Sequence, residues 1–357
     1  MRKPDPGAPF PPEGDLLPSK EKQVLVVPQL KAQIEAAEDF ARRSTPPNTV
    51  KAYESDWRLF ADWCERMSID ASSPDPQYVA AYLSGMASGM NEANRSYAVA
   101  TIERHLSSIC WRYRLAGNPL DRKDGRITSV MRGIRNTCLK APARKEAVLA
   151  EDLKKMVGLL PLTNIKAVRN RALLLIGFAG GLRRSEIVGL DLGPMQSPSG
   201  DPGHKGWVQV FEEGLLLTIR NKGEKIREVE IGRGTLPLFC PVKAYKDWVS
   251  MAKIASGPVF RRIGGGGKVT SERLRDAAVA DLVKRLALAA GLGEHLSEKA
   301  RKRAFAGHSL RAGFASSAEI DEAFVQKHLG HATAEMTRRY KRHRDRFRTN
   351  LTQAAGL

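Results

Sequence analysis

Four short stretches in the second half of this 357-residue chain carry side chains that could act on phosphate. They are GGLRRSE (residues 180–186), RNKGEK (220–225), GHSLRAGF (307–314) and LGHATAEMTRRY (329–340). Guanidinium and ammonium groups bind phosphate oxygens, an imidazole takes up a proton near neutral pH, and a deprotonated phenol is a nucleophile. The stretches therefore hold the groups that a phosphoryl transfer needs.

Each of these side chains also has an ordinary structural interpretation when it is considered by itself. Arg183 follows a Gly-Gly-Leu break and is consistent with a helix cap, and Lys222 is consistent with a solvated hairpin tip. His308 and Arg311 could form a surface pair, and His331 could be a hydrogen-bonded histidine at a helix start. No single stretch is enough to assign a function.

The last stretch predicts a helix that opens at Ala334, with Thr333 as its N-cap and Glu335 in the first turn. Met336 and Tyr340 lie four residues apart and share one face of that helix, which is the usual spacing of a packing stripe. Taken alone, this stretch favours packing for Tyr340.

Together and in this order, the four stretches resemble the catalytic domain of the tyrosine recombinases, the phage integrase family that includes Cre-like and Xer-like enzymes. The matching positions are Arg183, Glu186, Lys222, His308, Arg311, His331 and Tyr340. Tyr340 lies 9 residues after His331, which lies 20 residues after Arg311, and packing alone does not require this arrangement. Because Lys225 follows Lys222 so closely, either could be the hairpin lysine of the family.

The resemblance implies attack on a DNA phosphodiester without a metal ion. Negative charge then develops on the nonbridging oxygens, and fixed cations must stabilise it. Arg183 and Arg311 suit this task, because a planar guanidinium donates to phosphate through two hydrogen bonds and stays charged. Glu186, three residues after Arg183 and so on the same helix face, is expected to orient the basic groups.

The remaining positions would move protons and form the covalent bond. A phenol with a pKa of about 10 must lose its proton to attack phosphorus but is also a fair leaving group, so Tyr340 fits both steps. His308 is the expected proton acceptor, and His331 is expected to donate a hydrogen bond to the phosphate. Lys222 would protonate the departing 5′ oxygen. The implied intermediate is a 3′-phosphotyrosine.

The charge balance indicates a polyanionic partner. The chain has 58 Lys and Arg against 39 Asp and Glu, a net charge of +19, and an ordinary globular hydrophobic content of 42%. Residues 1–150 hold 22 basic and 18 acidic residues, so most of the excess lies in residues 151–357. Nucleic acid is the leading partner.

Several other classes of site are not indicated by the sequence. The four cysteines lie far apart, which argues against a zinc knuckle or a disulfide framework, and the sequence has neither GxxxxGK[ST] nor GxGxxG. We therefore expect no cofactor. Residues 1–30 are rich in proline, form no signal peptide and predict a disordered tail on a cytoplasmic, nucleoid-associated protein without a membrane segment.

The first half of the chain predicts a small helical bundle. Apolar residues with three-four spacing begin at Val50, and further helices are expected over about 76–88, 96–115 and 127–138. The aromatic core candidates are Tyr53, Tyr82, Tyr97 and Tyr113. By resemblance, residues 31–140 form a core-binding, SAM-like DNA-binding domain, and the basic proline-containing stretch around 141–149 is a linker.

The second half, residues 150–357, predicts the catalytic domain. It combines helices over 170–190 (broken at Gly180-Gly181), 240–256 and 272–291 with strands over 207–211, 215–221 and 227–231. A further strand end is expected at 261–263. The predicted fold class is mainly α with a small antiparallel β-sheet. The loop over 194–206 is longer than the family resemblance leads us to expect.

The resemblance also implies an assembly. Four protomers would act on two double-stranded DNA sites with inverted repeats, each clamping DNA between its two domains, with accessory proteins possible. The candidate DNA contacts are Arg104, Arg112, Arg114, Arg132 and Arg135. Residues 348–357 either dock on a neighbouring protomer or form a frayed terminus.

Three alternatives remain open at the level of sequence. A metal-dependent nuclease could use His308, His328 and His331, although carboxylate ligands are missing from those stretches. A noncatalytic DNA-binding protein explains the charge but leaves the matched positions unexplained. A type IB topoisomerase or a telomere resolvase would share the chemistry and differ only in substrate.

Overall fold

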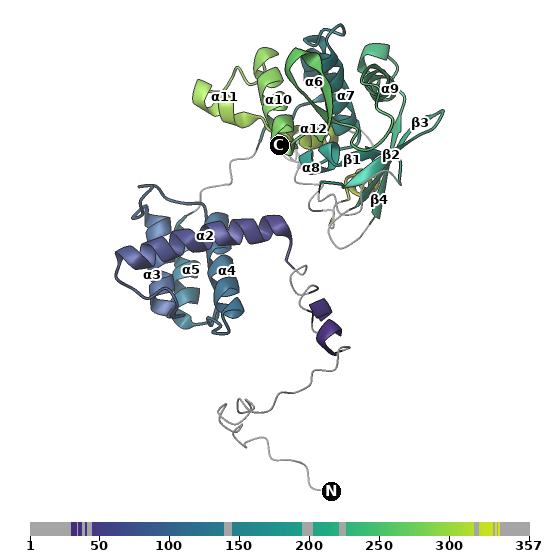
Figure 1. Cartoon of the computed structure of the whole chain (residues 1–357). Helices are drawn as coiled ribbons and strands as arrows, with labels where there is room; N and C mark the ends of the chain where they lie inside the picture. Colours follow the sequence, from purple (N-terminus) through teal and green to yellow (C-terminus); the bar gives the residue numbers. More distant parts are fainter. Residues whose placement is uncertain are drawn as a thin grey trace. The chain divides into compact units, whose positions relative to one another are not determined.

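The chain forms two compact units, Met1–Pro142 and Ala143–Leu357 (Figure 1). The computed structural model describes residues 30–33, 35–37, 40, 45–138, 145–194, 203–220, 226–317, 321–330, 333 and 335. Within those ranges no helix combines the length and the apolar character needed to span a bilayer.

The first unit is a bundle of helices that begin where the sequence provides caps. Its elements are α2 (Pro47–Arg66), α3 (Pro76–Ser88), α4 (Val99–Leu115) and α5 (Gly125–Thr137). Proline at the first position of α2 and α3 costs no hydrogen bond, since that N–H has no partner within a helix. The carboxylates of Asp75 and Asp124 accept hydrogen bonds from the first turns of α3 and α5, at Gln77 and Arg126.

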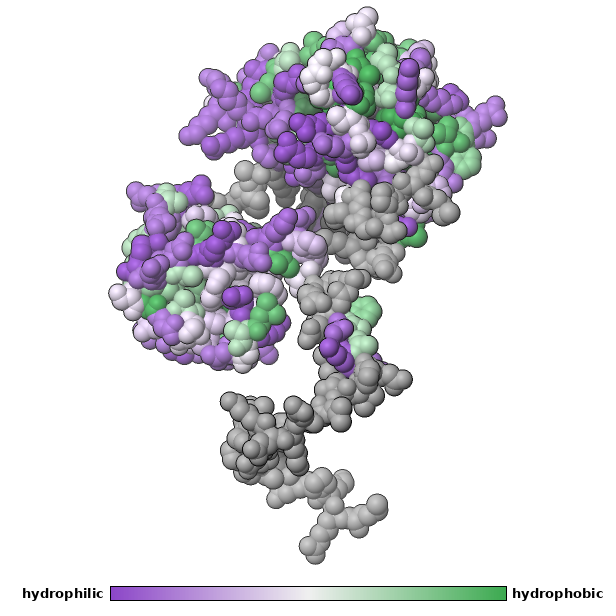
Figure 2. Space-filling model, in the orientation of Figure 1, coloured by the Kyte–Doolittle hydropathy of each residue, from purple (hydrophilic) through white to green (hydrophobic). Residues whose placement is uncertain are grey.

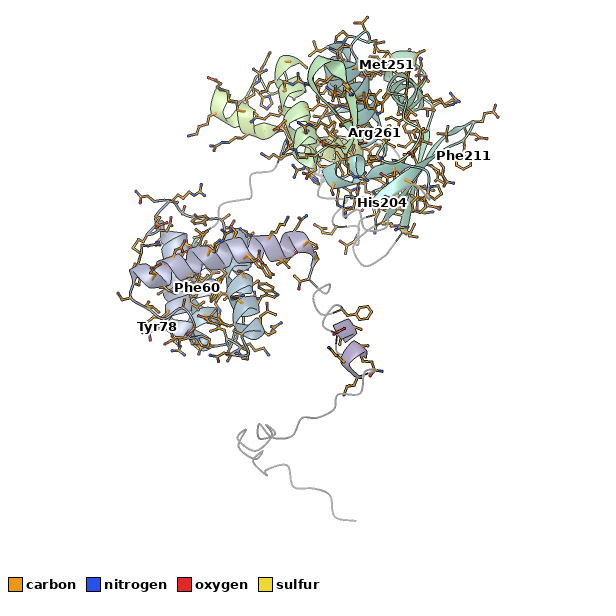
Figure 3. The ribbon with its side chains drawn as sticks, viewed as in Figure 1. Phe60, Tyr78, His204, Phe211, Met251 and Arg261 are labelled. Atoms are coloured by element: carbon orange, nitrogen blue, oxygen red, sulfur yellow. The ribbon has the colours of Figure 1, made fainter. Side chains whose placement is uncertain are left out.

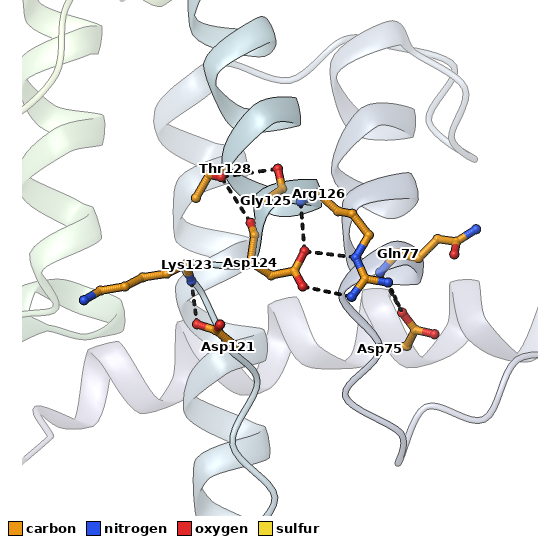
Figure 4. A network of polar contacts seen from close by, with 8 residues as sticks. All are labelled: Asp75, Gln77, Asp121, Lys123, Asp124, Gly125, Arg126 and Thr128. Carbon is orange, nitrogen blue, oxygen red and sulfur yellow. Dashed lines mark hydrogen bonds and ion pairs between the residues drawn. The ribbon is translucent and has the colours of Figure 1, made fainter.

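The cap of α5 is part of a larger polar network (Figure 4). The Nε and Nη2 atoms of Arg126 donate to the two carboxylate oxygens of Asp124 at 2.9 and 2.8 Å. These hydrogen bonds lower the pKa of Asp124 to about 2. The same guanidinium lies 3.7 Å from Asp75, so one arginine links the starts of α3 and α5.

Aromatic side chains fill the centre of this bundle. Phe60 is 1% exposed and meets Tyr82 edge to face at 5.1 Å between ring centroids, whereas Tyr78 is 39% exposed (Figure 3). Tyr82 and Tyr113 are buried, as the sequence predicts. Tyr97 is half-buried and packs against this core, so the prediction holds for it in part. The prediction is wrong for Tyr53, which is half-buried and meets the Trp111 ring at 5.6 Å between centroids.

The second unit places helices beside a four-stranded sheet (Figure 1). The α-helices are α6 (Ala150–Gly158), α7 (Ile165–Ala179), α8 (Arg184–Val188), α9 (Pro241–Met251), α10 (Asp276–Ala289), α11 (Glu298–Ala304), α12 (His308–Ser317) and α13 (Glu322–Leu329). Short 3₁₀ turns cover Pro237–Phe239 and Gly265–Gly267. Trp248 is fully buried in α9 and donates from Nε1 to the carbonyl of Val259 at 2.8 Å. The helices and sheet thus share one hydrophobic core.

The larger sheet has the strand order β1 (Leu190–Leu192), β2 (Gly206–Val210), β3 (Gly214–Arg220) and β4 (Ile226–Gly232). β2, β3 and β4 pair antiparallel as predicted, but β1 pairs parallel with β2, so the sheet is mixed at one edge. The smaller sheet joins β5 (Arg261–Ile263) to β6 (Val269–Arg273). The fold is mainly helical with small sheets, which confirms the predicted class.

Several predicted element boundaries are wrong for identifiable reasons. The apolar helix expected over 170–190 is α7, which begins at Ile165 because the Asn164 side chain caps it, and is followed by α8 and β1. The helix expected over 272–291 begins only at Asp276, since Glu272 and Arg273 belong to β6. The helix expected to reach 256 ends at Met251.

The segment before α6 packs as part of the second unit. The N–H of Glu146 donates to the carbonyl of Ala304 at 2.9 Å, and the N–H of Val148 donates to that of Ser309 at 3.0 Å. Val148 is fully buried. Residues 146–148 of the expected linker are therefore tied to the ends of α11 and α12.

The surface view in Figure 2 is largely hydrophilic, with a green patch on the second unit. Val210 and Phe211, at the end of β2, are 47% and 49% exposed. Phe211 is labelled in Figure 3 at the tip of the sheet. Val210 and the adjacent Phe211 are therefore two neighbouring apolar side chains that solvent reaches in the second unit.

Candidate active site

The GGLRRSE stretch forms the turn between α7 and α8. Gly181 has a φ of +55°, in the left-handed region, and a Cβ atom there would lie 2.3 Å from Cδ2 of Leu329 at the end of α13. Only glycine combines this backbone conformation with so close an approach. The turn therefore brings Gly181, two residues before Arg183, against Leu329, the last residue of α13.

Arg183 stands at the N-cap of α8 and is held by Glu186 one turn later. The backbone N–H of Arg183 donates to Oε2 of Glu186 at 2.8 Å, and its Nη1 donates to Oε1 at 2.6 Å. The Arg183 side chain is 43% exposed, whereas that of Glu186 is only 6% exposed. Burial alone would raise the pKa of Glu186, but the charge of Arg227 and the hydrogen bonds and charge of Arg183 outweigh it and lower that pKa.

Arg227 is a site neighbour that the sequence analysis did not single out. Its Nη2 donates to Oε2 of Glu186 at 3.0 Å, and its Nη1 donates to the carbonyl of His328 at 2.6 Å. The side chain is 6% exposed. The available signal was the alternation along β4, in which Arg227, Val229 and Ile231 are the buried positions.

Arg311 lies inside the protein on α12 and is 1% exposed. Its Nη1 donates to the carbonyl of Gly181 at 2.7 Å, and its Nη2 donates to the carbonyl of Leu329 at 2.6 Å. The alternative of a surface pair with His308 is therefore wrong for this residue. Arg311 instead ties the α7–α8 turn to the end of α13.

His308 is the first residue of α12 and is exposed as a whole. Partial burial of its ring lowers the pKa, and the nearby positive charges of Arg311, Arg183 and Arg184 lower it further. The imidazole is therefore neutral at pH 7 and able to accept a proton. The structure brings His308, Arg311, Arg183 and Glu186 to one junction.

His328 occupies a structural position near this junction. Its Nε2 lies 2.9 Å from the carbonyl of Ala179, which requires the nitrogen to donate, and its ring stacks on Phe314 with centroids 4.7 Å apart. Burial is the main cause that lowers its pKa. Among the described residues, no group of three or more His, Cys, Asp or Glu side chains is arranged to hold a metal ion.

Four predicted site positions lie outside the described residues: Lys222, Lys225, His331 and Tyr340. Of the predicted helix from Ala334 only Glu335 is described, as helical, and residues 348–357 lie outside the described residues. The described chain does fix what flanks three of these positions. Arg220 and Ile226 pair at the ends of β3 and β4, so both lysines belong to the connection between those strands, and His331 directly follows Gly330, the C-cap of α13.

The candidate DNA-contact residues of the first unit lie on exposed surfaces of α4 and α5. Arg104 is ion-paired with the buried Asp56, and Arg135 lies 2.8 Å from Glu103. Arg112 lies over the Trp57 ring at 5.8 Å, and Arg114 and Arg132 are exposed. The first two therefore share their charge with a carboxylate, and Arg104 also supports the bundle.

Comparison with known proteins identifies the family. The phage integrase family profile matches residues 148–346, which is more than half of the chain. The integrase/recombinase xerD homolog of Selenomonas ruminantium is 30% identical over 320 residues, covering 86% of this chain and 85% of that protein. Tyrosine recombinase XerC of Pseudomonas aeruginosa (strain LESB58) is 36% identical over 177 residues, covering 49% of this chain and 47% of that protein.

Solved structures share the fold. The XerH site-specific recombinase bound to palindromic difH substrate aligns with a TM-score of 0.52 and 21% sequence identity, covering 79% of this chain and 72% of that chain. The family resemblance expected from the four stretches is thus confirmed by the profile and by the full-length relative. The chain belongs to the phage integrase family and is a tyrosine recombinase.

Proposed function

We propose that this tyrosine recombinase cleaves and rejoins DNA strands at a specific site through a 3′-phosphotyrosine on Tyr340. The observation that supports this best is the junction of the α7–α8 turn with the ends of α12 and α13. There Arg183 and Arg311 are held by hydrogen bonds, and His308 begins α12 within reach of the charges of both arginines. In the sequence His331 is the second residue after α13, and Tyr340 follows nine residues later.

The proposed step is a balanced exchange of one phosphodiester for another. The Oη atom of Tyr340 attacks phosphorus, the bond to the 5′ oxygen breaks, and the phenolic proton passes to His308. Lys222 supplies the proton that the departing 5′ oxygen takes up. Because the phosphotyrosine keeps the energy of the broken bond, a 5′ hydroxyl of another strand can reverse the step without a nucleotide cofactor.

Arg183 and Arg311 would stabilise the charge that develops on the nonbridging oxygens. Arg311 is fixed in orientation by the carbonyls of Gly181 and Leu329, so its guanidinium pays little entropy on binding phosphate. Arg183 is more exposed and is oriented through Glu186. Removing one such arginine from a phosphoryl-transfer site costs roughly 10³ to 10⁵ in rate.

We further propose that residues 31–140 form a DNA-binding domain and that four protomers act on two inverted-repeat sites. XerH is described as bound to its difH substrate, which supports DNA as the partner of this chain as well. Arg112, Arg114 and Arg132 are the exposed candidates for backbone contacts. Contacts to phosphate would position the domain, and contacts to bases would give specificity.

The test is covalent capture on a DNA site selected from a random pool. We expect the wild-type protein to form an adduct with a suicide substrate, in which the cleaved strand diffuses away and cannot be rejoined. Tyr340→Phe should bind the same DNA without forming an adduct. Binding with no adduct from the wild-type protein, in the presence or absence of divalent metal, would refute the proposed chemistry.

A further inference from the structure

We propose that Arg227 is a positioning residue for strand cleavage, which couples the Arg183–Glu186 pair to the end of α13. This inference rests on the proposed function and adds a residue that none of the four stretches contains. Arg227 does not need to touch DNA in this role. It acts through the groups that it holds.

Arg227 occupies a core position where an apolar residue is the ordinary choice. Along β4 the side chains alternate between buried and exposed, and Val229 and Ile231 take the next two buried positions. Placing an arginine there costs desolvation, which lowers its pKa even though the charge of Glu186 opposes the change. A buried ion pair contributes little net stability compared with apolar packing, so stability alone is a weak reason for Arg227.

The hydrogen bonds of Arg227 join two elements of the junction. One amino group binds the carboxylate that also holds Arg183, at 3.0 Å. The other binds the carbonyl of His328 at 2.6 Å, three residues before His331. A single planar guanidinium therefore joins α8 to α13, and a point charge cannot make the same bridge.

The stem of Arg227 also lies close to Gly330, the C-cap of α13. Gly330 has a φ of +63°, and a Cβ atom there would lie 2.8 Å from Cδ of Arg227. The left-handed C-cap of α13 therefore lies against the stem of this arginine. Since Arg227 is also the second residue of β4, it lies at the base of the hairpin that carries Lys222.

Electrostatics predict what the loss of Arg227 would do. Among the described residues Glu186 forms ion pairs with Arg183 and Arg227. Without Arg227, the buried carboxylate would keep only the pair with Arg183. The carboxylate would then draw the Arg183 guanidinium inward, away from a phosphate at the surface. At the same time the carbonyl of His328 would lose its donor, and the end of α13 would be free to shift.

The experiment compares Arg227→Met and Arg227→Lys with Arg171→Met as a matched control. Arg171 is also a buried arginine that pairs with a carboxylate, Asp247 at 3.1 Å, and binds the carbonyls of Pro237 and Leu238. Its partners lie in α9 and a 3₁₀ turn, and none belongs to the junction. Each variant is measured for melting temperature, DNA affinity and single-turnover adduct formation at a temperature where circular dichroism shows it folded.

We expect both methionine variants to have lower melting temperatures than wild type. Only Arg227→Met should cleave DNA about 100-fold more slowly at unchanged DNA affinity, because a misplacement of catalytic groups by about 1 Å costs about that factor in rate. Arg227→Lys should recover most of the melting temperature and only part of the rate. Equal rates for folded Arg227→Met and wild type, or equal losses of rate in Arg227→Met and Arg171→Met, would overturn the inference. Wild-type protein that forms no adduct would instead refute the proposed function itself.

Discussion

Lysine substitutions at the two arginines of the junction should have similar effects on cleavage and different effects on stability. Arg311 is 1% exposed and binds two carbonyls from separate segments, at 2.7 and 2.6 Å. One lysine ammonium cannot occupy both amino positions, so Arg311→Lys leaves at least one buried carbonyl without its donor. The Arg183 side chain is 43% exposed, and Arg183→Lys keeps a cation beside Glu186.

The magnitudes follow from these contacts. Leaving one buried carbonyl unpaired costs about 1–3 kcal/mol, and the lost bond came from a charged donor, so we expect Arg311→Lys to lose about 2–3 kcal/mol. For a unit of this size that corresponds to a melting temperature lower by roughly 4–12 °C. Arg183→Lys keeps the charge beside the buried Glu186 and changes only the more exposed partner, so we expect it to lose less than about 1 kcal/mol.

Urea denaturation and single-turnover cleavage of a suicide substrate separate the two effects. Both variants should cleave at least about 10³-fold more slowly than wild type, because lysine replaces a bidentate phosphate donor by a point charge. Equal stability of Arg311→Lys and wild type would mean that the carbonyl contacts do not constrain the folded protein. A larger loss in the free energy of unfolding for Arg183→Lys than for Arg311→Lys would contradict this prediction.

Two further predictions concern the turn and the histidines. Gly181→Ala should lower the free energy of unfolding by about 1–3 kcal/mol in urea titrations, since the φ of +55° and the Leu329 contact exclude a Cβ atom. An unchanged urea midpoint would contradict this. Gly117→Ala is the control for backbone strain alone, because Gly117 has a φ of +76° and no atom near the added Cβ. The pKa values of His105, His308 and His328 are all lowered, in each case mainly by burial. Their contribution to the free energy of unfolding is therefore complete above the pKa of about 6.5 in the unfolded chain, and it is lost as the pH falls toward the lower pKa values of the folded protein. In a plot of cleavage rate against pH, the fall in rate on the acidic side should accordingly have its midpoint below pH 6.5. A midpoint above pH 6.5 would contradict a His308 whose pKa is lowered by burial and by nearby positive charges.

The sequence predicted those features that depend on local pattern. Regular apolar spacing predicted the four helices of the first unit, and alternation with a Lys-Gly turn predicted the pairing of β3 with β4. The Gly180-Gly181 break was visible because glycine in an apolar helix marks a turn. Arg183, Glu186, His308 and Arg311 were found through their order and spacing, which is how the family was recognised.

Features that depend on contacts between distant segments could not be predicted in the same way. β1 has only three residues and pairs parallel with β2, so no hairpin turn in the sequence indicates this strand. β6 reads VTSER and has no buried residue, so it lacks the apolar alternation of a strand. Arg227 appears as one more charge in a basic hairpin until the register of β4 places it on the buried face with Val229.

The burial of Arg311 shows the same limit. Its residue type and position indicated a phosphate donor, but nothing local indicated that its guanidinium would bind the carbonyls of Gly181 and Leu329. Those partners are 130 and 18 residues away in the chain. The role of one arginine as both a structural tie and a candidate phosphate ligand therefore emerged only from the folded structure.

The most direct test of the central claim is to identify the atom that becomes joined to DNA. Wild-type protein trapped on a suicide substrate would be digested with nuclease and protease, and the modified peptide sequenced by mass spectrometry. We predict a nucleotide attached through its 3′ phosphate to Tyr340. A linkage to any other residue, or through a 5′ phosphate, would contradict the account.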